Sequence, residues 1–357
     1  MSYMGNKIKI EIFGESHSPT IGMTLTGLPS GEKIDFDRLY EFMSRRAPGR
    51  DATSTARKEA DMPQFLCGVV DGVTTGAPVT AVIHNSDQHS KDYEKLRNTP
   101  RPSHSDYAAY VKYDGKNDIR GGGAFSGRLT APLCIGGGIA KQILEKRGIS
   151  VAAHVYSIGG VCDIPFDAVN PCDVEAPGKK DFPTVSDEAG ERMRKVILDA
   201  KADGDSIGGV VECVVTGIDA GFGGPLFEGV EGRISQALFG IPAVKGVEFG
   251  AGFKVSEMRG SECNDPFEYK DGKVVTVTNN SGGIQGGITN GMPITVRAAF
   301  KPTPSIAKEQ KTVDLATKEN TVLTIGGRHD PCVVVRAVAA VEAAVAITIL
   351  DLLEESK

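Results

Sequence analysis

The chain lacks the cysteine pattern of a disulfide framework or of a zinc site. Its seven cysteines are odd in number and scattered, and no two of them are spaced C-x-x-C. Disulfide-stapled secreted domains and structural zinc sites both depend on paired or closely spaced cysteines. The N-terminus, MSYMGNKIKI, also has no apolar signal core. We therefore expect a cytoplasmic protein with neither a disulfide framework nor a bound metal.

The sequence also lacks a basic excess and a long uninterrupted apolar run. The formal net charge is −6 and the pI is about 5.6, which argues against nucleic acid or an anionic membrane as a partner. The most apolar stretch, residues 332–353, is interrupted by Arg336, Glu342 and Asp351. It therefore predicts a buried, Ala-rich helix rather than a membrane span.

No linker or low-complexity tract divides the 357 residues, which predicts a single domain over residues 1–357. Segments rich in Val, Ile and Thr and bounded by Gly or Pro predict strands at 7–13, 20–28, 65–70, 78–84, 149–158, 207–218, 243–249, 273–279 and 293–300. Helical periodicity predicts helices at 35–46, 104–113, 128–147, 187–202, 230–240 and 332–354. These elements do not alternate in a βαβ rhythm, and neighbouring strands in the second half favour antiparallel pairing. The expected fold class is therefore α+β, built in layers.

Local signals mark several helix ends. Asp35 is placed to cap the first helix, and Ser186 to cap the fourth, with acidic residues in its opening turn. Gly148 lies just past the end of the third helix, where a left-handed residue is common.

The polar segment Gly14-Glu15-Ser16-His17 closes the first long strand pattern. An imidazole beside a carboxylate and a hydroxyl, where a strand becomes a loop, is placed to move a proton on a ligand. The alternative is a satisfied structural histidine.

A second segment, Arg45-Arg46-Ala47-Pro48-Gly49-Arg50, carries guanidiniums suited to bidentate binding of phosphate or carboxylate. Because two of these arginines end a predicted helix, compensation of the helix dipole is an equal alternative. A third segment, residues 101–107, offers His104 to a ligand. Its alternative is a helix start capped by Ser103 or Ser105 with an incidental histidine.

Three glycine-bearing segments follow. Residues 120–130 place Gly121-Gly122-Gly123 before a helix, which suits a phosphate cradle, although the segment is neither a Walker loop nor a dinucleotide fingerprint; the alternative is a closely packed turn. Residues 279–288 and 301–305 suit a flat aromatic ring and an anion, or two hairpin turns. In residues 326–332, Arg328, His329 and Asp330 suit phosphate binding and proton relay, and Asp330 is equally placed to cap the last helix with Pro331 at its first position; the two roles are compatible.

Taken together, these segments resemble the chorismate synthase family in the same chain order and over nearly the whole sequence. The resemblance rests on GESH at 14–17, RRAPG at 45–49, RPSHSDY at 101–107, RGGG with a following Ser and Arg at 120–128, DGDSIGG at 203–209, AVKGVEFG at 243–250, SGGIQGGI at 281–288, KPTPS at 301–305 and GRHDP at 327–331.

The resemblance implies a lyase that removes phosphate and a ring proton from 5-enolpyruvylshikimate 3-phosphate in a 1,4-anti elimination. The product is chorismate, at the last common step of the shikimate pathway to the aromatic amino acids. It implies dependence on reduced FMN without net oxidation, helices between two mostly antiparallel sheets, and a homotetramer.

The resemblance also implies residue roles. His17 would protonate the leaving phosphate, His104 would balance flavin charge, and Asp330 would assist removal of the ring proton. The residues implied to bind FMN are Ala124, Phe125, Ser126, Pro242, Ala243, Gly286, Lys301, Pro302, Thr303, Pro304, Ser305 and Arg328. Those implied to bind substrate or NADP are Arg46, Arg50 and Arg128.

The chain departs from many relatives at Ala124-Phe125-Ser126, where they carry Arg-Ser-Ser, so a basic residue is missing from that loop. Nothing in the sequence decides whether the chain reduces FMN with NADPH itself. Two other functions remain open: a flavin oxidoreductase, and a non-catalytic flavin- or phosphate-binding protein.

Overall fold

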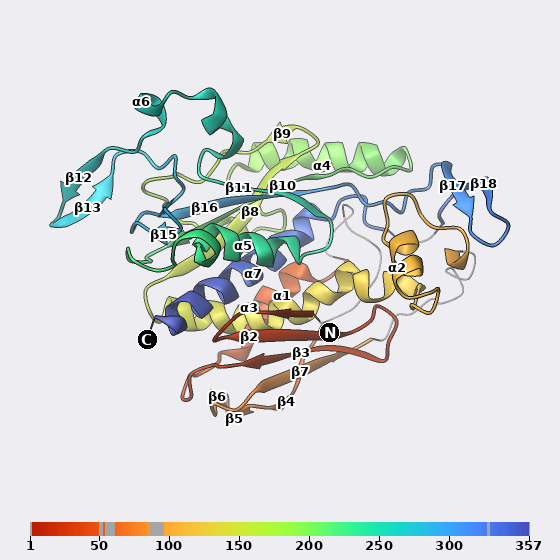
Figure 1. Ribbon diagram of the computed structural model, residues 1–357, viewed down its shortest axis with the longest axis horizontal. Coiled ribbons are helices and arrows are strands. Elements are labelled where there is room, and N and C mark those ends of the chain that lie inside the picture. The colour runs from red at the N-terminus through yellow and green to blue at the C-terminus, as the bar shows by residue number, and fades with distance from the viewer. Residues whose placement is uncertain (1, 50–52, 54–60, 86–95, 327–328, 357) are drawn as a thin grey trace.

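Two antiparallel sheets enclose a layer of helices in the computed structural model, which describes residues 2–49, 53, 61–85, 96–326 and 329–356 (Figure 1). The first sheet has the strand order β1 (Ser2–Met4), β2 (Lys9–Gly14), β3 (Thr20–Thr26), β7 (Val79–His84) and β4 (Gln64–Cys67). The second has the order β11 (Val244–Phe249), β16 (Ile294–Phe300), β10 (Gly209–Thr216), β8 (Ser150–Ile158) and β9 (Val161–Cys162). The α+β class and the layered, mostly antiparallel arrangement are thereby confirmed.

The helices between the sheets are α1 (Phe36–Arg46), α3 (Thr130–Glu145), α5 (Val230–Phe239) and α7 (Val334–Glu355). Helix α4 (Asp187–Ala202) covers the outer face of the second sheet, and α2 (Asp106–Lys112) lies at one end of the molecule (Figure 1). Smaller elements are β5 (Val69–Val70), β6 (Val73–Thr74), α6 (Gly260–Cys263) and the paired strands β12 (Phe267–Lys270), β13 (Lys273–Thr276), β14 (Ile284–Gln285), β15 (Ile288–Thr289), β17 (Gln310–Asp314) and β18 (Glu319–Leu323).

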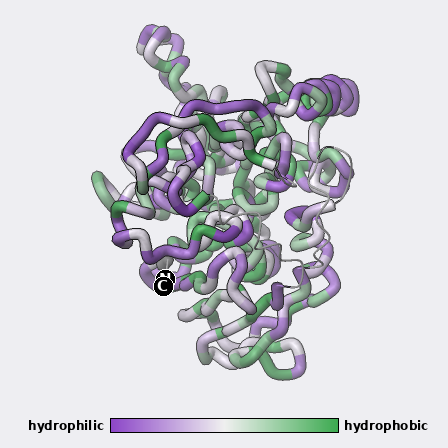
Figure 2. The backbone as a smooth tube through the Cα atoms, turned by 90° about the vertical axis from the view of Figure 1, so that its right-hand side faces the viewer, coloured by the Kyte–Doolittle hydropathy of each residue, from purple (hydrophilic) through white to green (hydrophobic). Residues whose placement is uncertain are grey.

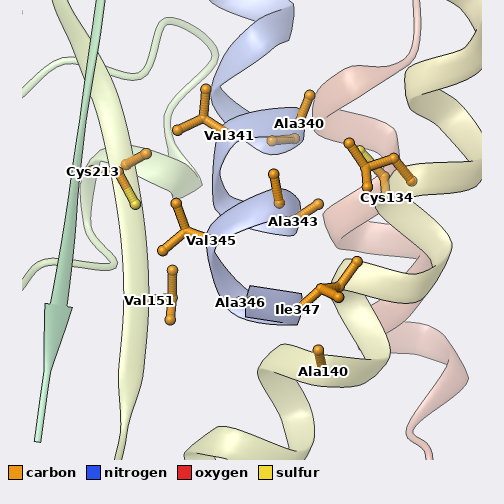
Figure 3. Packing of buried hydrophobic residues seen from close by; sticks show 14 of the residues in the cluster. Cys134, Ala140, Val151, Cys213, Ala340, Val341, Ala343, Val345, Ala346 and Ile347 are labelled. Carbon is orange, nitrogen blue, oxygen red and sulfur yellow. The ribbon is translucent and has the colours of Figure 1, made fainter. Parts of the chain in front are cut away.

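Helix α7 is the centre of the core, as its Ala- and Val-rich sequence predicted. Figure 3 shows it between Cys134 and Ala140 on α3 and Val151 and Cys213 on β8 and β10. The contact with α3 is so close that a Cβ added at Gly137 would lie 2.2 Å from that of Ala343. Small side chains therefore let the helical layer pack tightly against both sheets.

Hydrophobic segments gather in the interior, and hydrophilic ones lie mainly at the periphery (Figure 2). None of the described helices combines the length and the apolar character needed to cross a bilayer. The charged residues of α7 that interrupt its apolar run are satisfied by partners: Asp351, for example, accepts the backbone N–H of Ile8 at 2.7 Å.

Two of the helix caps predicted from the sequence are confirmed. The carboxylate of Asp35 accepts the N–H of Arg38 at 3.1 Å, and the hydroxyl of Ser186 accepts that of Ala189 at 3.3 Å. Gly148 follows α3 in the left-handed region with φ +77°.

Two other caps are wrong. Ser105 precedes α2 but makes no side-chain capping bond, and α7 begins at Val334, so Asp330 does not cap it. The Asp330 carboxylate instead accepts a hydrogen bond from Arg336 in the first turn of α7. The helix begins four residues beyond Asp330, so this carboxylate bonds to a side chain of the first turn instead of to its backbone N–H groups.

Candidate active site

Three consecutive glycines organise the site. Gly121, Gly122 and Gly123 have φ angles of +60°, +91° and +54° in the short turn between α2 and α3. Residues with a Cβ rarely adopt this region, so only glycine forms such a run without strain.

The imidazoles of His17 and His104 lie against neighbouring members of this triplet. A Cβ added at Gly121 would lie 2.5 Å from His17 Nδ1, and one added at Gly122 would lie 3.2 Å from His104 Nε2. Two histidines from distant parts of the sequence are thus brought to one backbone segment. The absence of side chains on the triplet makes this approach possible.

His17 is held by the loop that closes β2. The N–H of Ser16 donates to the carbonyl of Gly123 at 3.1 Å, which ties this loop to the glycine triplet. His17 is buried, with 2% of its surface exposed. Asp118 lies close enough to His17 for their charges to interact. The pKa of Asp118 is lowered chiefly by its hydrogen bond to the Arg120 guanidinium, and the charge of His17 lowers it further.

His104 is held by an acid and a guanidinium. Its Nδ1 lies 2.5 Å from Asp106 Oδ1, and Asp106 accepts two hydrogen bonds from Arg101, from Nε at 2.7 Å and from Nη2 at 2.8 Å. Arg101 also donates to the hydroxyl of Ser305 at 3.2 Å. Burial opposes ionisation of Asp106, but its bonds to Arg101 and His104 prevail and hold its pKa well below the usual range.

A buried network of guanidiniums adjoins the histidine loops. Arg46 donates to Asp61 at 2.8 Å and to the carbonyl of Gly127 at 2.8 Å, and Arg128 pairs with the other oxygen of Asp61. Arg128 also donates to Asn85 at 3.0 Å. Two of the arginines predicted to bind anions, Arg46 and Arg128, therefore lie together around one carboxylate, whose pKa they lower against the effect of burial.

Asp330 joins the same network through a residue of α7. Arg336 donates to Asp330, and its Nε donates to the backbone carbonyl of Arg46 at 3.0 Å. The end of α1 and the start of α7 are thus connected by one guanidinium.

The second sheet contributes two lysines to the site, Lys301 and Lys245. The N–H of Lys301 donates to the carbonyl of Ala243 at 3.0 Å, and its ammonium donates to the carbonyl of Ser103, next to His104. Burial, and then the charge of Lys245, lowers the pKa of Lys301. A register shift between Val244 and Gly246 makes Lys245 an extra residue in the ladder, and such bulges often reorient a side chain beside a site.

The comparisons with known proteins agree on one family. The family model for chorismate synthase matches residues 8–353. A chorismate synthase from Thermococcus kodakarensis is 48% identical over 349 residues, which is 97% of this chain and 96% of that protein. One from Korarchaeum cryptofilum is 46% identical over 97% of this chain and 96% of its own length. The chain belongs to the chorismate synthase family.

The fold agrees with that of a solved chorismate synthase. Its crystal structure superposes with a TM-score of 0.77 at 27% identity and covers 99% of this chain and 93% of the other. The chorismate synthase resemblance inferred from the ordered motifs is therefore confirmed.

Not every residue that the chorismate synthase motifs imply is brought to the two imidazoles. Ser126 is close, because its Cβ lies 3.8 Å from a Cβ added at Gly122, while Ala124 and Phe125 next to it are exposed. Gly286 lies on the β14–β15 hairpin, at the opposite end of β16 from Lys301 (Figure 1). Arg50 and Arg328 lie outside the described residues, so their roles stay predictions.

The sequence reasoning missed several residues of this chorismate synthase site. Arg101 and Asp106 stood inside the quoted RPSHSDY motif, and their charges flanking His104 were the available signal. Lys245 likewise stood inside AVKGVEFG. Asp61 and Arg336 gave no local signal, because their partners are distant in sequence.

Proposed function

We propose that this chain carries out the chorismate synthase reaction with reduced FMN bound beside the glycine triplet. The reaction is a carbon–oxygen lyase step in which a ring C–H bond and the C–O bond to phosphate break and a new ring double bond forms. The observation that carries the proposal is the approach of His17 and His104 to Gly121 and Gly122, next to the Arg46–Arg128 network. A substrate with two carboxylates and a phosphate needs such a concentration of positive charge.

The residues present fit a flavin mononucleotide. Two buried hydroxyls, Ser16 Oγ and Thr303 Oγ1, have no hydrogen-bond partner among the described residues. The glycine triplet carries no side chains, so a ligand can approach its backbone closely. Residues 124–126, 242–243 and 301–305 would hold the group, with Arg328 as a further predicted contact.

Bound reduced FMN would supply electron density to the reacting ring and recover it, so that no net oxidation occurs. His17 is assigned as the acid that donates a proton to the departing phosphate, because an imidazole titrates near neutrality. Its burial beside the glycine triplet keeps bulk water from this proton.

Arg46 and Arg128 are assigned to the anionic groups of the substrate or of NADP. Both guanidiniums are already oriented by Asp61, so little side-chain entropy is lost on binding. Asp330, fixed by Arg336, is assigned to the proton that leaves the ring.

We further propose that the chain is one domain over residues 1–357, acts in the cytoplasm and assembles as a homotetramer. Large apolar side chains are exposed on the elements around α5 and β12, including Phe227 at 95%, Tyr269 at 83% and Phe253 at 82%. Such exposure is typical of surfaces that subunits bury. Light scattering coupled to gel filtration tests the assembly, and a mass of one chain would contradict it.

The decisive test of function is an anaerobic assay with dithionite-reduced FMN and 5-enolpyruvylshikimate 3-phosphate. We expect phosphate release and chorismate absorbance to rise together, with no consumption of reductant in proportion to product. In a parallel assay with NADPH in place of dithionite, steady NADPH consumption matching product would instead indicate an oxidoreductase. Tight FMN binding without phosphate release would indicate a binding protein.

A further inference from the structure

We propose that Arg101 and Asp106 act as positioning residues that fix His104 in the tautomer with its proton on Nδ1, so that Nε2 is presented to the glycine triplet. This inference deepens the proposed function, since it names the residues that prepare one of its two histidines. Neither residue is among those that the family resemblance placed in the site.

The geometry is that of an acid holding an imidazole by one nitrogen. Asp106 Oδ1 lies 2.5 Å from His104 Nδ1, and the other nitrogen, Nε2, lies 3.2 Å from where a Cβ of Gly122 would be. The two ring nitrogens therefore have different surroundings: one faces a carboxylate and the other faces the site.

The carboxylate is itself held in place. Arg101 binds Asp106 through its backbone N–H at 3.0 Å and through two guanidinium nitrogens, and it is anchored further by Ser305. Arg101 and Asp106 are both nearly buried, at 4% and 8% exposure. A bidentate guanidinium fixes both the position and the ionised state of the acid.

The short distance to Asp106 decides which group bonds to Nδ1. Arg101 Nη2 also lies 3.1 Å from this nitrogen, but a guanidinium can only donate. If Nδ1 carried a lone pair, an ionised carboxylate oxygen would face it at 2.5 Å and repel it. A proton on Nδ1 turns this contact into a hydrogen bond. The Arg101 guanidinium then donates to the Asp106 carboxylate rather than to the imidazole.

The charged groups facing His104 are Arg101, Asp106 and Lys301. Burial lowers the pKa of His104, and Arg101 and Lys301 act in the same direction, while Asp106 opposes them. Removing the acid and removing the guanidinium should therefore move the imidazole pKa in opposite directions. The tautomer itself separates a positioning role from one confined to stabilising the start of α2.

The test is NMR of the full chain with ¹⁵N-labelled histidine, with the His104 signals assigned from the His104→Gln variant. In the unsubstituted chain we expect the Nδ1–H tautomer. Asp106→Asn should remove the preference for the Nδ1–H tautomer and lower the pKa of His104. Arg101→Gln should raise the pKa of His104. Because this readout needs no turnover, it holds or fails independently of the proposed function.

A second buried histidine–acid pair provides the matched control. His154 Nδ1 lies 3.1 Å from Asp163, in the second sheet, so Asp163→Asn makes the same chemical change elsewhere. It should leave the His104 signals unchanged. An Nε2–H tautomer in the unsubstituted chain would overturn the proposal even if every variant failed to fold, and so would equal effects of the two Asp→Asn changes.

Kinetics add a second readout. With reduced FMN, Asp106→Asn should lower kcat by at least about tenfold and change KM little, because a misplaced proton affects the reaction more than binding. Asp106→Glu should recover part of the loss by restoring the carboxylate. Unaltered kcat and pH profile in Asp106→Asn would contradict a positioning role.

Discussion

Arg45 and Arg46 are adjacent in sequence but direct their guanidiniums into separate ion-pair networks. Arg45 binds Glu342 on α7 at 2.5 Å, and Arg46 binds Asp61 at 2.8 Å. Glu342 also accepts a bond from Lys141 at 2.6 Å and one from the N–H of Ala153 at 3.0 Å. At the end of α1, Arg45 thus binds a carboxylate of the core, and Arg46 binds one in the candidate site.

Glu342→Gln should therefore destabilise the fold. The change removes the carboxylate that pairs with the buried Lys141 and the partly buried Arg45, and breaking a buried ion pair typically costs about 3 kcal/mol. Urea unfolding measures this loss. The control is Glu188→Gln, which removes an exposed pair with Arg192 on α4 and should change the free energy of unfolding by less than about 0.5 kcal/mol. Equal effects of the two variants would refute the assignment.

His17→Ala and His104→Ala should each lower turnover by about a hundredfold or more, the usual effect of losing a general acid or base. The measurement is phosphate release with reduced FMN and saturating substrate. His84→Ala is the control, because His84 is exposed and its side chain bonds to Gln64 at 3.1 Å rather than to the glycine triplet. A rate near that of the unsubstituted enzyme would remove the histidine concerned from the mechanism.

Gly121→Ala should abolish activity through a clash. The new Cβ would lie 2.4 Å from Ser16 Oγ and 2.5 Å from His17 Nδ1, so the imidazole of His17 has to move. Gly148→Ala shares the left-handed backbone, with φ +77°, but its Cβ would meet open space. Both variants carry a strain of about 1–2 kcal/mol, and only the first should lose turnover. If activity fell equally in both, strain alone would be the cause.

His154 should make folding stability depend on pH. It is fully buried between Asp163 and Glu212, at 3.1 and 3.0 Å, and these carboxylates raise its pKa against the effect of burial. A raised folded-state pKa means that the stabilisation is complete below the unfolded value of about 6.5 and is lost as pH rises through the folded value.

Denaturant unfolding of the unsubstituted chain and of His154→Gln at a series of pH values tests this. The advantage of the unsubstituted chain should shrink above neutrality. The pKa values of Asp163 and Glu212 are lowered, so their own contributions persist there and fade only in acid. A difference that stays constant with pH would show that folding does not shift the pKa of His154, and one that grows as pH rises would show that the fold holds this imidazole neutral.

The sequence predicted the elements whose signals are local. The first helix could be placed because Asp35 caps it and its apolar residues recur with helical spacing. The α7 helix could be placed because its apolar residues run almost unbroken. In contrast, β17 and β18 were not predicted, since their sequences QKTVD and ENTVL are polar and form a hairpin with little buried surface.

The sequence predicted individual residues of the candidate site but not the contacts between them. His17, His104 and Arg46 could be singled out by chemical type and by motif. Asp61 and Arg336, which contact Arg46, could not, because a pairing such as Arg336 with the carbonyl of Arg46 depends on how α1 and α7 pack. Tertiary contacts of this kind leave no trace in local spacing.

The close contact between Gly137 and Ala343 has a consequence for chemistry far from either residue. His17 comes from the first sheet, whereas Ala243 and Lys301 come from the second, and the helices lie between them. The thickness of that middle layer therefore sets how far His17 lies from Lys301. A single methyl group at Gly137 would push α3 and α7 apart. It would thereby change the distance between His17 and Lys301 without touching either residue.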